Sequence, residues 1–391
     1  MDSGFGQGNG TAPAESDLNA ADRAKVGRLR GLLRWATGLA LFLASSALFY
    51  SLSPFELRGG DRQWIIPKIG EGVVSFDYHT PLPIVLYQEA YRLWGARGLT
   101  AEAIMAVGSA LSGGLFVLAL LSFSRNPRFW VPCLATGSLM VFWGHVEVHA
   151  PSYAFGLWFM LLGIRYARGE SRSAWPMCVA WFAACLCHMS NVFYLPALLS
   201  LVWQRGGKDV KPSDLTVIAL TRSVSVRVSQ AVKPIALTAI ALSLIFLVAP
   251  LLLPSVNYHT LALERLVPLF RLTGPKHRFT LFSWAHVEIV VWFWFLASPL
   301  APIGLVGGFR RGWRDKAWRF LAIASGCALF WTFLWNPDLG LDDWDLFCQC
   351  AVPLNVLTGW TLLLGHSDAQ QPSLSAPPPS FPETASQEQS Q

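Results

Sequence analysis

Residues 99–123 read LTAEAIMAVGSALSGGLFVLALLSF, a stretch whose single ionisable residue, Glu102, lies close to its beginning. About 20 apolar residues are enough for a helix to cross the hydrocarbon core of a bilayer, so this stretch predicts a membrane-spanning helix. Similar apolar stretches follow along the chain. We predict about ten spans, at residues 32–52, 99–123, 129–145, 151–167, 174–188, 190–203, 234–254, 286–308, 320–336 and 347–365.

The composition agrees with a protein embedded in a membrane. Of the 391 residues, 53% are hydrophobic and 14% are charged, whereas a soluble domain carries about 25% charged residues. So few charges cannot cover a water-facing surface, which excludes an ordinary soluble enzyme. The 18 Trp residues suit a protein with two membrane–water interfaces to anchor. The predicted fold class is therefore an all-α, polytopic transmembrane helical bundle.

The distribution of Lys and Arg predicts the orientation. Ten spans place both termini on one side, and most of the 30 basic residues fall in segments on that side. Because cytoplasmic loops are enriched in Lys and Arg, we predict cytoplasmic termini and a location in the cell inner (plasma) membrane. The formal net charge of +6 then reflects topology, and we expect no nucleic-acid partner.

The chain divides into three parts. Residues 1–31 are rich in Gly and Ala and residues 366–391 in Pro, Ser and Gln, so both are predicted to be disordered cytoplasmic segments. Residues 32–365 are predicted to form the transmembrane domain, which we expect to be catalytic. Its long first outer loop, 53–98, contains the short apolar segment 82–94, which we predict to be an amphipathic helix lying in the membrane interface.

Polar chemistry gathers on the predicted outer side. Every His except His366 falls there, and such one-sided accumulation of polar groups indicates a site that opens outward. In the first outer loop, Asp61 follows two glycines and Asp77 lies two residues before His79. A carboxylate held just above the bilayer could take a proton from an acceptor hydroxyl, so both acids are candidate bases.

The motif GHVEVHAPS carries His145, Glu147 and His149. In an extended chain the three side chains share one face and could form a metal site, whereas in a helix Glu147 points away from the two His. We favour hydrogen bonding to a polar ligand over a metal. A further polar turn, CLCHMSN, contains His188, which turn chemistry alone does not require.

Two more outer segments are strongly charged. The first is a basic patch on the predicted outer side, where the enrichment of Lys and Arg in cytoplasmic loops predicts few basic residues. Its cationic side chains suit phosphate binding. The patch contains Arg265, Arg271, Lys276, His277 and Arg278, and His286 follows at the mouth of the next span. The second, NPDLGLDDWDLF, contains Asp338, Asp342, Asp343 and Asp345. These acids could bind an acceptor or a sugar, hold a divalent cation, or form ion pairs with the basic patch.

The order of these features resembles the multi-spanning glycosyltransferases of the GT-C fold, which use polyprenyl-phosphate-linked sugars, as protein mannosyltransferases do. A short inner N-terminus and one span precede a long first outer loop with an acid and an interfacial helix. The phrases GHVEVHAPS, CHMSN, HRFTLFSWAH and NPDLGLDDWDLF are similar to stretches of bacterial, largely uncharacterised members. The resemblance covers most of residues 32–365.

The resemblance implies a cell-envelope enzyme with a polyprenyl-phosphate sugar donor, membrane lipid around it and an extracytoplasmic acceptor. The family's first-loop base maps onto Asp61, although Arg62 stands where the family often has a second acid, and Asp77 is the reserve. The donor phosphate would bind Lys276 and Arg278, with Arg271 and His277 behind them. The residues expected around the sugar and acceptor are His145, Glu147, His149, His188, His286, Asp343 and Asp345.

The sequence does not establish a cofactor. The one option is a divalent cation bound between the acids of NPDLGLDDWDLF and the run His145, Glu147 and His149. Two other functions remain open. A transporter or flippase would place charges or broken helices near mid-membrane, whereas the predicted spans have almost none at their centres. A membrane acyltransferase with a His base would place its His near a cytoplasmic donor, whereas here the His residues lie on the outer side.

Overall fold

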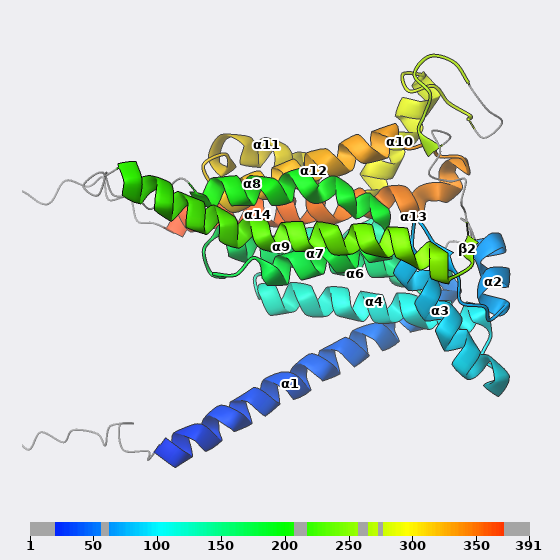
Figure 1. Ribbon diagram of the computed structural model, residues 1–391, viewed down its shortest axis with the longest axis horizontal. Helices are drawn as coiled ribbons and strands as arrows, with labels where there is room; N and C mark the ends of the chain where they lie inside the picture. Colours follow the sequence, from blue (N-terminus) through cyan, green and yellow to red (C-terminus); the bar gives the residue numbers. More distant parts are fainter. Residues whose placement is uncertain (1–19, 56–61, 207–216, 257–264, 273–276, 371–391) are drawn as a thin grey trace, which may run out of the picture.

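The computed structural model describes residues 20–55, 62–206, 217–256, 265–272 and 277–370. This part of the chain is all-α apart from two short strands (Figure 1). The α-helices are α1 (Ala20–Ser51), α2 (Arg62–Gly70), α3 (Pro81–Trp94), α4 (Ala101–Phe123), α5 (Pro127–Leu134), α6 (Ala150–Ala167), α7 (Trp175–Cys187), α8 (Leu195–Gly206), α9 (Val217–Leu252), α10 (Trp284–Ala297), α11 (Ala301–Gly312), α12 (Lys316–Leu334), α13 (Trp344–Phe347) and α14 (Ala351–Gln370).

Shorter elements connect these helices. The 3-10 turns in the regions used below are η2 (Ser53–Phe55), η3 (Gly95–Arg97), η4 (Gly137–Phe142), η5 (Met189–Tyr194), η9 (Gly340–Asp343) and η10 (Cys348–Cys350). Strands β1 (Phe76–Asp77) and β2 (Ser255–Val256) pair in parallel, with Asp77 opposite Val256. This pairing joins the first outer loop to the end of α9.

The bundle core is formed by α4, α6, α7, α12 and α14, whose buried aromatic and aliphatic side chains form one continuous cluster. The C-terminal part of helix α1 packs against α4, and the N-terminal part of α1 diverges from the bundle (Figure 1). A Cβ at Gly114 would collide with Ser46 of α1, so the glycine permits this close approach. Small residues at helix contacts are typical of membrane proteins.

The structure supports a polytopic membrane protein but changes the expected count of spans. Among the described residues, five helices are long and apolar enough to cross a membrane, and a sixth span results if α10 and α11 count as one. The segment predicted as a span at 286–308 is not one continuous helix: α10 and α11 meet at 86°, which makes it a broken span or a re-entrant loop. Pro299 and Pro302 lie at this break, and proline cannot continue a helix without losing a backbone hydrogen bond.

The predicted span at 129–145 is wrong. The structure has the eight-residue α5 there, which ends at Leu134 and is followed by η4. Thr136 caps η4, because its hydroxyl accepts a hydrogen bond from the amide of Ser138. Helix α7, within the predicted span 174–188, is apolar but shorter than a full crossing.

The first and last helices extend past the limits predicted for the transmembrane domain. Helix α1 begins at Ala20, so the helical part starts before residue 32, and α14 continues to Gln370. The first 19 residues and residues 371–391 lie outside the described part of the chain. The helix predicted at 82–94 is confirmed as α3, with two prolines in its first turn, where a missing N–H costs nothing.

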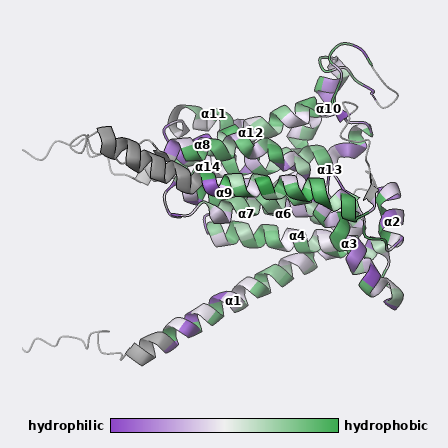
Figure 2. Ribbon diagram, in the orientation of Figure 1, coloured by the Kyte–Doolittle hydropathy of each residue, from purple (hydrophilic) through white to green (hydrophobic). Residues whose placement is uncertain are grey.

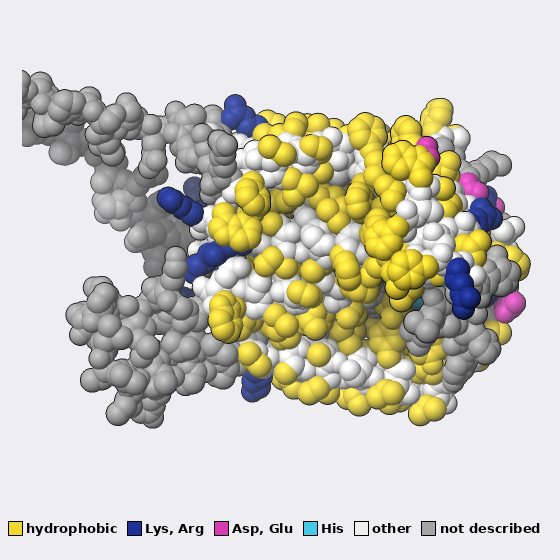
Figure 3. Space-filling view, turned by 90° about the horizontal axis from the view of Figure 1, so that it is seen from above, with side chains coloured by type: hydrophobic (Ala, Val, Ile, Leu, Met, Phe, Trp, Pro, Cys, Tyr) yellow, Lys and Arg dark blue, Asp and Glu magenta, His cyan; other side chains and the backbone are white. Residues whose placement is uncertain are grey.

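The two ends of the bundle differ in character. Figure 2 shows apolar helices between two more polar ends, and Figure 3 shows acidic side chains at the end formed by α2, α3 and α13. We call this the cavity end, because a cavity opens there. At the opposite end, where the α6–α7 and α11–α12 connections lie, Arg128, Arg168, Arg172 and Arg314 are exposed.

Candidate functional site

A cavity of about 490 Å³ opens at the cavity end of the bundle. Segments far apart in the sequence contribute to its wall, and most of the lining side chains are polar or charged. The lining residues are Trp64, Ile65, Lys68, Asp77, His79, Thr80, Ile84, Glu147, His149, His188, Arg265, Arg278, Trp335, Asp338, Leu339, Asp343, Asp345 and Leu346. So many ionisable groups beside an apolar bundle indicate a binding site for a polar or charged ligand.

The segment that precedes α6 supplies one wall. Residues 145–149 form neither helix nor strand, and Val146 and Val148 pack into an apolar cluster with α2, α3 and α4. The intervening Glu147 and His149 line the cavity instead. Gly144 begins this segment with a φ of 71°, a conformation that favours glycine, and a Cβ there would lie 2.7 Å from Cβ of Ser53.

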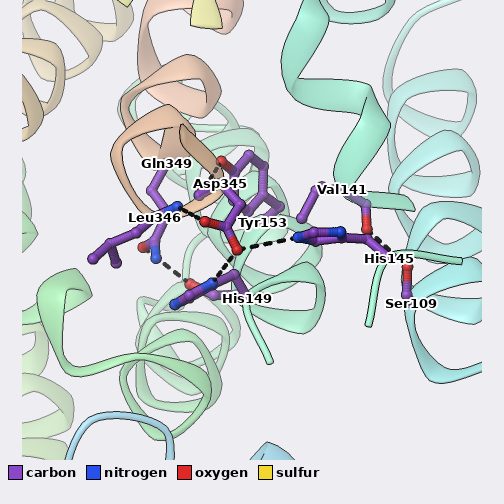
Figure 4. Close-up of polar contacts among 9 residues, drawn as sticks. Ser109, Val141, His145, His149, Tyr153, Asp345, Leu346 and Gln349 are labelled. Atoms are coloured by element: carbon purple, nitrogen blue, oxygen red, sulfur yellow. Dashed lines mark hydrogen bonds and ion pairs between the residues drawn. The ribbon is translucent and has the colours of Figure 1, made fainter. Parts of the chain in front are cut away.

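Asp345 is held between two histidines, as Figure 4 shows. Its Oδ2 lies 3.2 Å from Nε2 of His145 and 3.0 Å from Nδ1 of His149. The amide of Leu346 donates to Oδ1, and the hydroxyl of Tyr153 donates to the backbone carbonyl of Asp345. The carboxylate is almost completely buried, so these contacts hold it in one orientation at the cavity wall.

Glu147 completes a compact group of potential metal ligands. Each of the three buried residues Glu147, His149 and Asp345 offers one ligand atom, and these three atoms lie within 4.8 Å of one another. The mixture of one imidazole and two carboxylates is a donor set that divalent transition metals accept.

A hydrogen-bonded network supports the cavity beside His188. The hydroxyl of Ser190 lies 2.6 Å from Nδ1 of His188 and donates to Oε1 of Gln349 at 2.8 Å. Asn191 donates to Ser152 and to the carbonyls of Ala184 and His188. Burial, with the His149 and His79 rings nearby, holds the pKa of His188 well below its usual value. His188 is therefore a neutral hydrogen-bonding group at pH 7.

Asp77 ends β1, just before α3, and lies on the cavity wall. Its Oδ1 accepts hydrogen bonds from the amides of His79 and Thr80, at 2.7 and 3.1 Å. Gln88 fixes the approach to this position, because its side chain accepts from the amide of Ser75 and donates to the carbonyl of Lys68. These bonds tie α2, β1 and α3 together and set the position of the Asp77 carboxylate.

Three cationic side chains lie among the acids of the cavity. Arg265 forms an ion pair with Asp338 at 3.2 Å, so one of the three options left open for the acidic segment applies to Asp338. Arg278 approaches the turn at Gly340, where an added Cβ would lie 3.2 Å from its Nη1. Lys68, from α2, also lines the cavity. These cations could neutralise an anionic ligand.

The structure brings together many of the residues predicted from sequence. Seven of them line the cavity: Asp77, Glu147, His149, His188, Arg278, Asp343 and Asp345. Asp343 accepts a hydrogen bond from the amide of Leu339, so it also shapes the η9 turn. Asp61 and Lys276 lie outside the described residues, so their roles stay predictions.

Four predicted residues do not line the cavity. His145 lies behind Asp345 and contacts it from outside the cavity wall. His286 is buried between Phe279 and Phe333, with its Nδ1 2.8 Å from the carbonyl oxygen of Leu281. His277 is buried and Arg271 is exposed, both away from the cavity lining.

The cavity also includes residues that sequence reasoning did not assign to the site, among them Lys68, His79 and Trp335. His79 lies two residues after Asp77, which is a usable sequence signal. Lys68 and Trp335 gave no such sequence signal. A single Lys in a predicted outer loop and a Trp near the end of a span are ordinary features of membrane proteins.

No known protein family, no curated protein and no solved structure matches this chain. The chemistry of the cavity therefore carries the functional assignment.

Proposed function

We propose that this protein is a glycosyltransferase that moves a sugar from a polyprenyl-phosphate-linked donor to an acceptor on the extracytoplasmic side of the membrane. The observation that carries the proposal is the cavity itself. It combines carboxylates with the cations Lys68, Arg265 and Arg278 at one end of an apolar helical bundle. A lipid-linked donor has the matching character, because its phosphate and sugar are polar and its tail is apolar.

The carboxylates supply the base that such a transfer needs. The base accepts the proton of the acceptor hydroxyl, the acceptor oxygen bonds to the anomeric carbon, and the bond from that carbon to the phosphate oxygen breaks. The leaving phosphate keeps the electron pair, and the transition state has oxocarbenium-ion character. Among the described residues Asp77 is our candidate base, since its carboxylate lies on the wall and is fixed by two backbone amides.

The cations stabilise the charge that develops on the leaving phosphate. Fixed positive groups aimed at developing negative charge supply a large part of the catalysis in many enzymes. Arg278 and Lys68 suit this role. Arg265 already pairs with Asp338, so we expect it to hold the acidic segment in place as well as to contribute charge.

The orientation of the protein in the membrane is part of the proposal. The exposed Arg128, Arg168, Arg172 and Arg314 lie at the end opposite the cavity, and cytoplasmic ends are enriched in basic residues. The cavity would then open to the outside, where the acceptor is located, and both termini would be cytoplasmic.

Native mass spectrometry tests the donor. Protein extracted gently from the membrane should carry a polyprenyl-phosphate lipid, with its sugar where the linkage survives. We expect Arg278→Ala to lower the lipid-bound fraction at least tenfold. Arg172→Ala is the matched control, because Arg172 is exposed in the α6–α7 connection at the opposite end of the bundle and does not line the cavity, and it should retain the lipid. Wild-type protein without any polyprenyl-phosphate lipid, or equal retention by both variants, would contradict the proposal.

A further inference from the structure

The polar residues of the cavity do not have equal surroundings. Asp338 is partly exposed and paired with Arg265, whereas Glu147 and Asp345 are about 1% and 2% exposed. Their oxygens lie within 4.8 Å of each other and of a ring nitrogen of His149. Two carboxylates buried so close together repel each other when both are ionised, and a positive charge between them removes this repulsion.

We propose that Glu147, His149 and Asp345 bind one divalent transition-metal ion at the inner wall of the cavity. A divalent ion between two carboxylates and one neutral imidazole makes the group electrically neutral, which suits a buried position. All three residues line the cavity, so the remaining coordination positions of the ion face the space where a ligand binds. Three protein ligands with an open position are typical of catalytic rather than purely structural metal sites.

The geometry agrees with this assignment. Nδ1 of His149 and Oδ2 of Asp345 lie 3.0 Å apart. Two ligand bonds of about 2.1 Å at the tetrahedral angle place their ligand atoms about 3.4 Å apart, so an ion needs this pair to separate by only about 0.4 Å. An oxygen of Glu147 lies within 4.8 Å of the other two ligand atoms, so the three side chains face a common point.

His145 and Tyr153 form the support that such a site needs. His145 contacts Oδ2 of Asp345 from outside the cavity lining, and Tyr153 donates to the backbone carbonyl of Asp345. The amide of Leu346 holds the other carboxylate oxygen. Partners of this kind orient metal ligands, and their removal commonly weakens metal affinity by about 10- to 100-fold. His145 is therefore a positioning residue for the ion.

The donor set also indicates which ions bind. Imidazole suits Zn²⁺ and other transition metals, whereas Mg²⁺ and Ca²⁺ prefer oxygen ligands alone. We expect Zn²⁺ and Mn²⁺ to bind and a tenfold excess of Mg²⁺ or Ca²⁺ not to displace them. If the proposed sugar transfer is correct, the open coordination positions of the ion would bind phosphate oxygens of the donor. Donor binding by the ion rests on the proposed function, whereas binding of the ion itself does not.

Metal binding is tested on the full chain in detergent. The protein is treated with a chelator, equilibrated with Zn²⁺ or Mn²⁺ alone, desalted and analysed by elemental mass spectrometry. We expect about one ion per chain in wild type and below about 0.1 in Glu147→Gln and Asp345→Asn. Glu170→Gln is the matched control, because it removes an exposed carboxylate in the α6–α7 connection at the opposite end of the bundle and should keep the ion. His145→Gln should weaken affinity about 10- to 100-fold.

Two measurements on the wild-type protein test the metal site even if the variants fail to fold. Electron spin-echo spectra of the Mn²⁺-loaded protein should show coupling to one imidazole nitrogen, and bound Zn²⁺ should raise the melting temperature. Wild type that binds less than 0.1 ion, or Mn²⁺ without nitrogen coupling, would overturn the metal site. Because these measurements use neither lipid nor sugar, their failure is distinct from failure of the proposed transfer.

Discussion

The two ends of the helical bundle both carry charged residues, but they carry them differently. At the end away from the cavity, Arg128, Arg168, Arg172 and Arg314 are exposed and spread over separate connections. At the cavity end, Glu147, Asp345 and His149 are buried, and they converge from two segments about 200 residues apart. Exposed charges of one sign suit a role in topology, whereas buried and convergent charges are costly unless they bind something.

Surface labelling tests whether the two ends lie on opposite sides of the membrane, and it gives an all-or-none result. Glu71 is exposed at the end of α2, near the cavity, and Ser173 is exposed in the α6–α7 connection. In right-side-out vesicles, a membrane-impermeant maleimide should label Glu71→Cys and not Ser173→Cys. Inverted vesicles should give the opposite pattern. Labelling of both positions from one side would contradict the account of the two ends.

The largest expected effect on activity comes from Asp77→Asn. The amide oxygen can still accept hydrogen bonds from His79 and Thr80, but the side chain can no longer take a proton. We expect kcat for sugar transfer to fall by about 10²- to 10⁴-fold, with the melting temperature nearly unchanged. Glu170→Gln, at the opposite end of the bundle, is the matched control and should leave kcat unchanged. Equal activity of Asp77→Asn and wild type would remove Asp77 as the base.

The stability of the two ends should also differ. Asn191 is buried and donates to Ser152, Ala184 and His188, so Asn191→Ala leaves buried acceptors without their donor. We expect a loss of about 2 kcal/mol in the free energy of unfolding. Ser171→Ala removes an exposed hydrogen bond to Ser173 and should change stability by less than about 0.5 kcal/mol. Thermal unfolding in detergent compares the two, and similar losses would show that burial at the cavity end is not decisive.

The smallest effect is expected for single charges at the opposite end. Arg168 is more than half exposed, pairs with Glu170 and lies over the ring of Trp360. Exposed ion pairs of this kind contribute at most about 1 kcal/mol. Arg168→Gln should therefore leave sugar transfer unchanged and lower the melting temperature only slightly. A large loss of transfer activity in this variant would mean that the functional site extends through the bundle.

Local sequence patterns predicted the helices best where apolar segments lacked breaks. The segments that became α3 and α4 were found because their apolar length and flanking residues carry the signal locally. The span predicted at 129–145 was overestimated, and the one predicted at 286–308 is broken by an 86° bend. Average hydrophobicity registers neither Thr136 as the cap of η4 nor the position of Pro299 between α10 and α11.

The site was predictable only in part. His149 and Asp345 were found because ionisable residues are unusual beside membrane spans. That Asp345 lies between His145 and His149 could not be predicted, because this contact depends on how α13 packs beside the segment before α6. His286 stood out in the sequence for the same reason as His149, yet it lies between two phenylalanine rings. Sequence position alone cannot separate these two environments.

The most direct test of the central claim is an experimental structure of the protein with its co-purified lipid. If the protein uses a polyprenyl-phosphate-linked donor, density for a phosphate should lie within hydrogen-bond distance of Arg278 or Lys68, inside the cavity lined by Asp77 and Asp345, with the lipid tail extending into the membrane. A polyprenyl phosphate bound at the opposite end of the bundle, or a cavity filled by a different class of ligand, would contradict it.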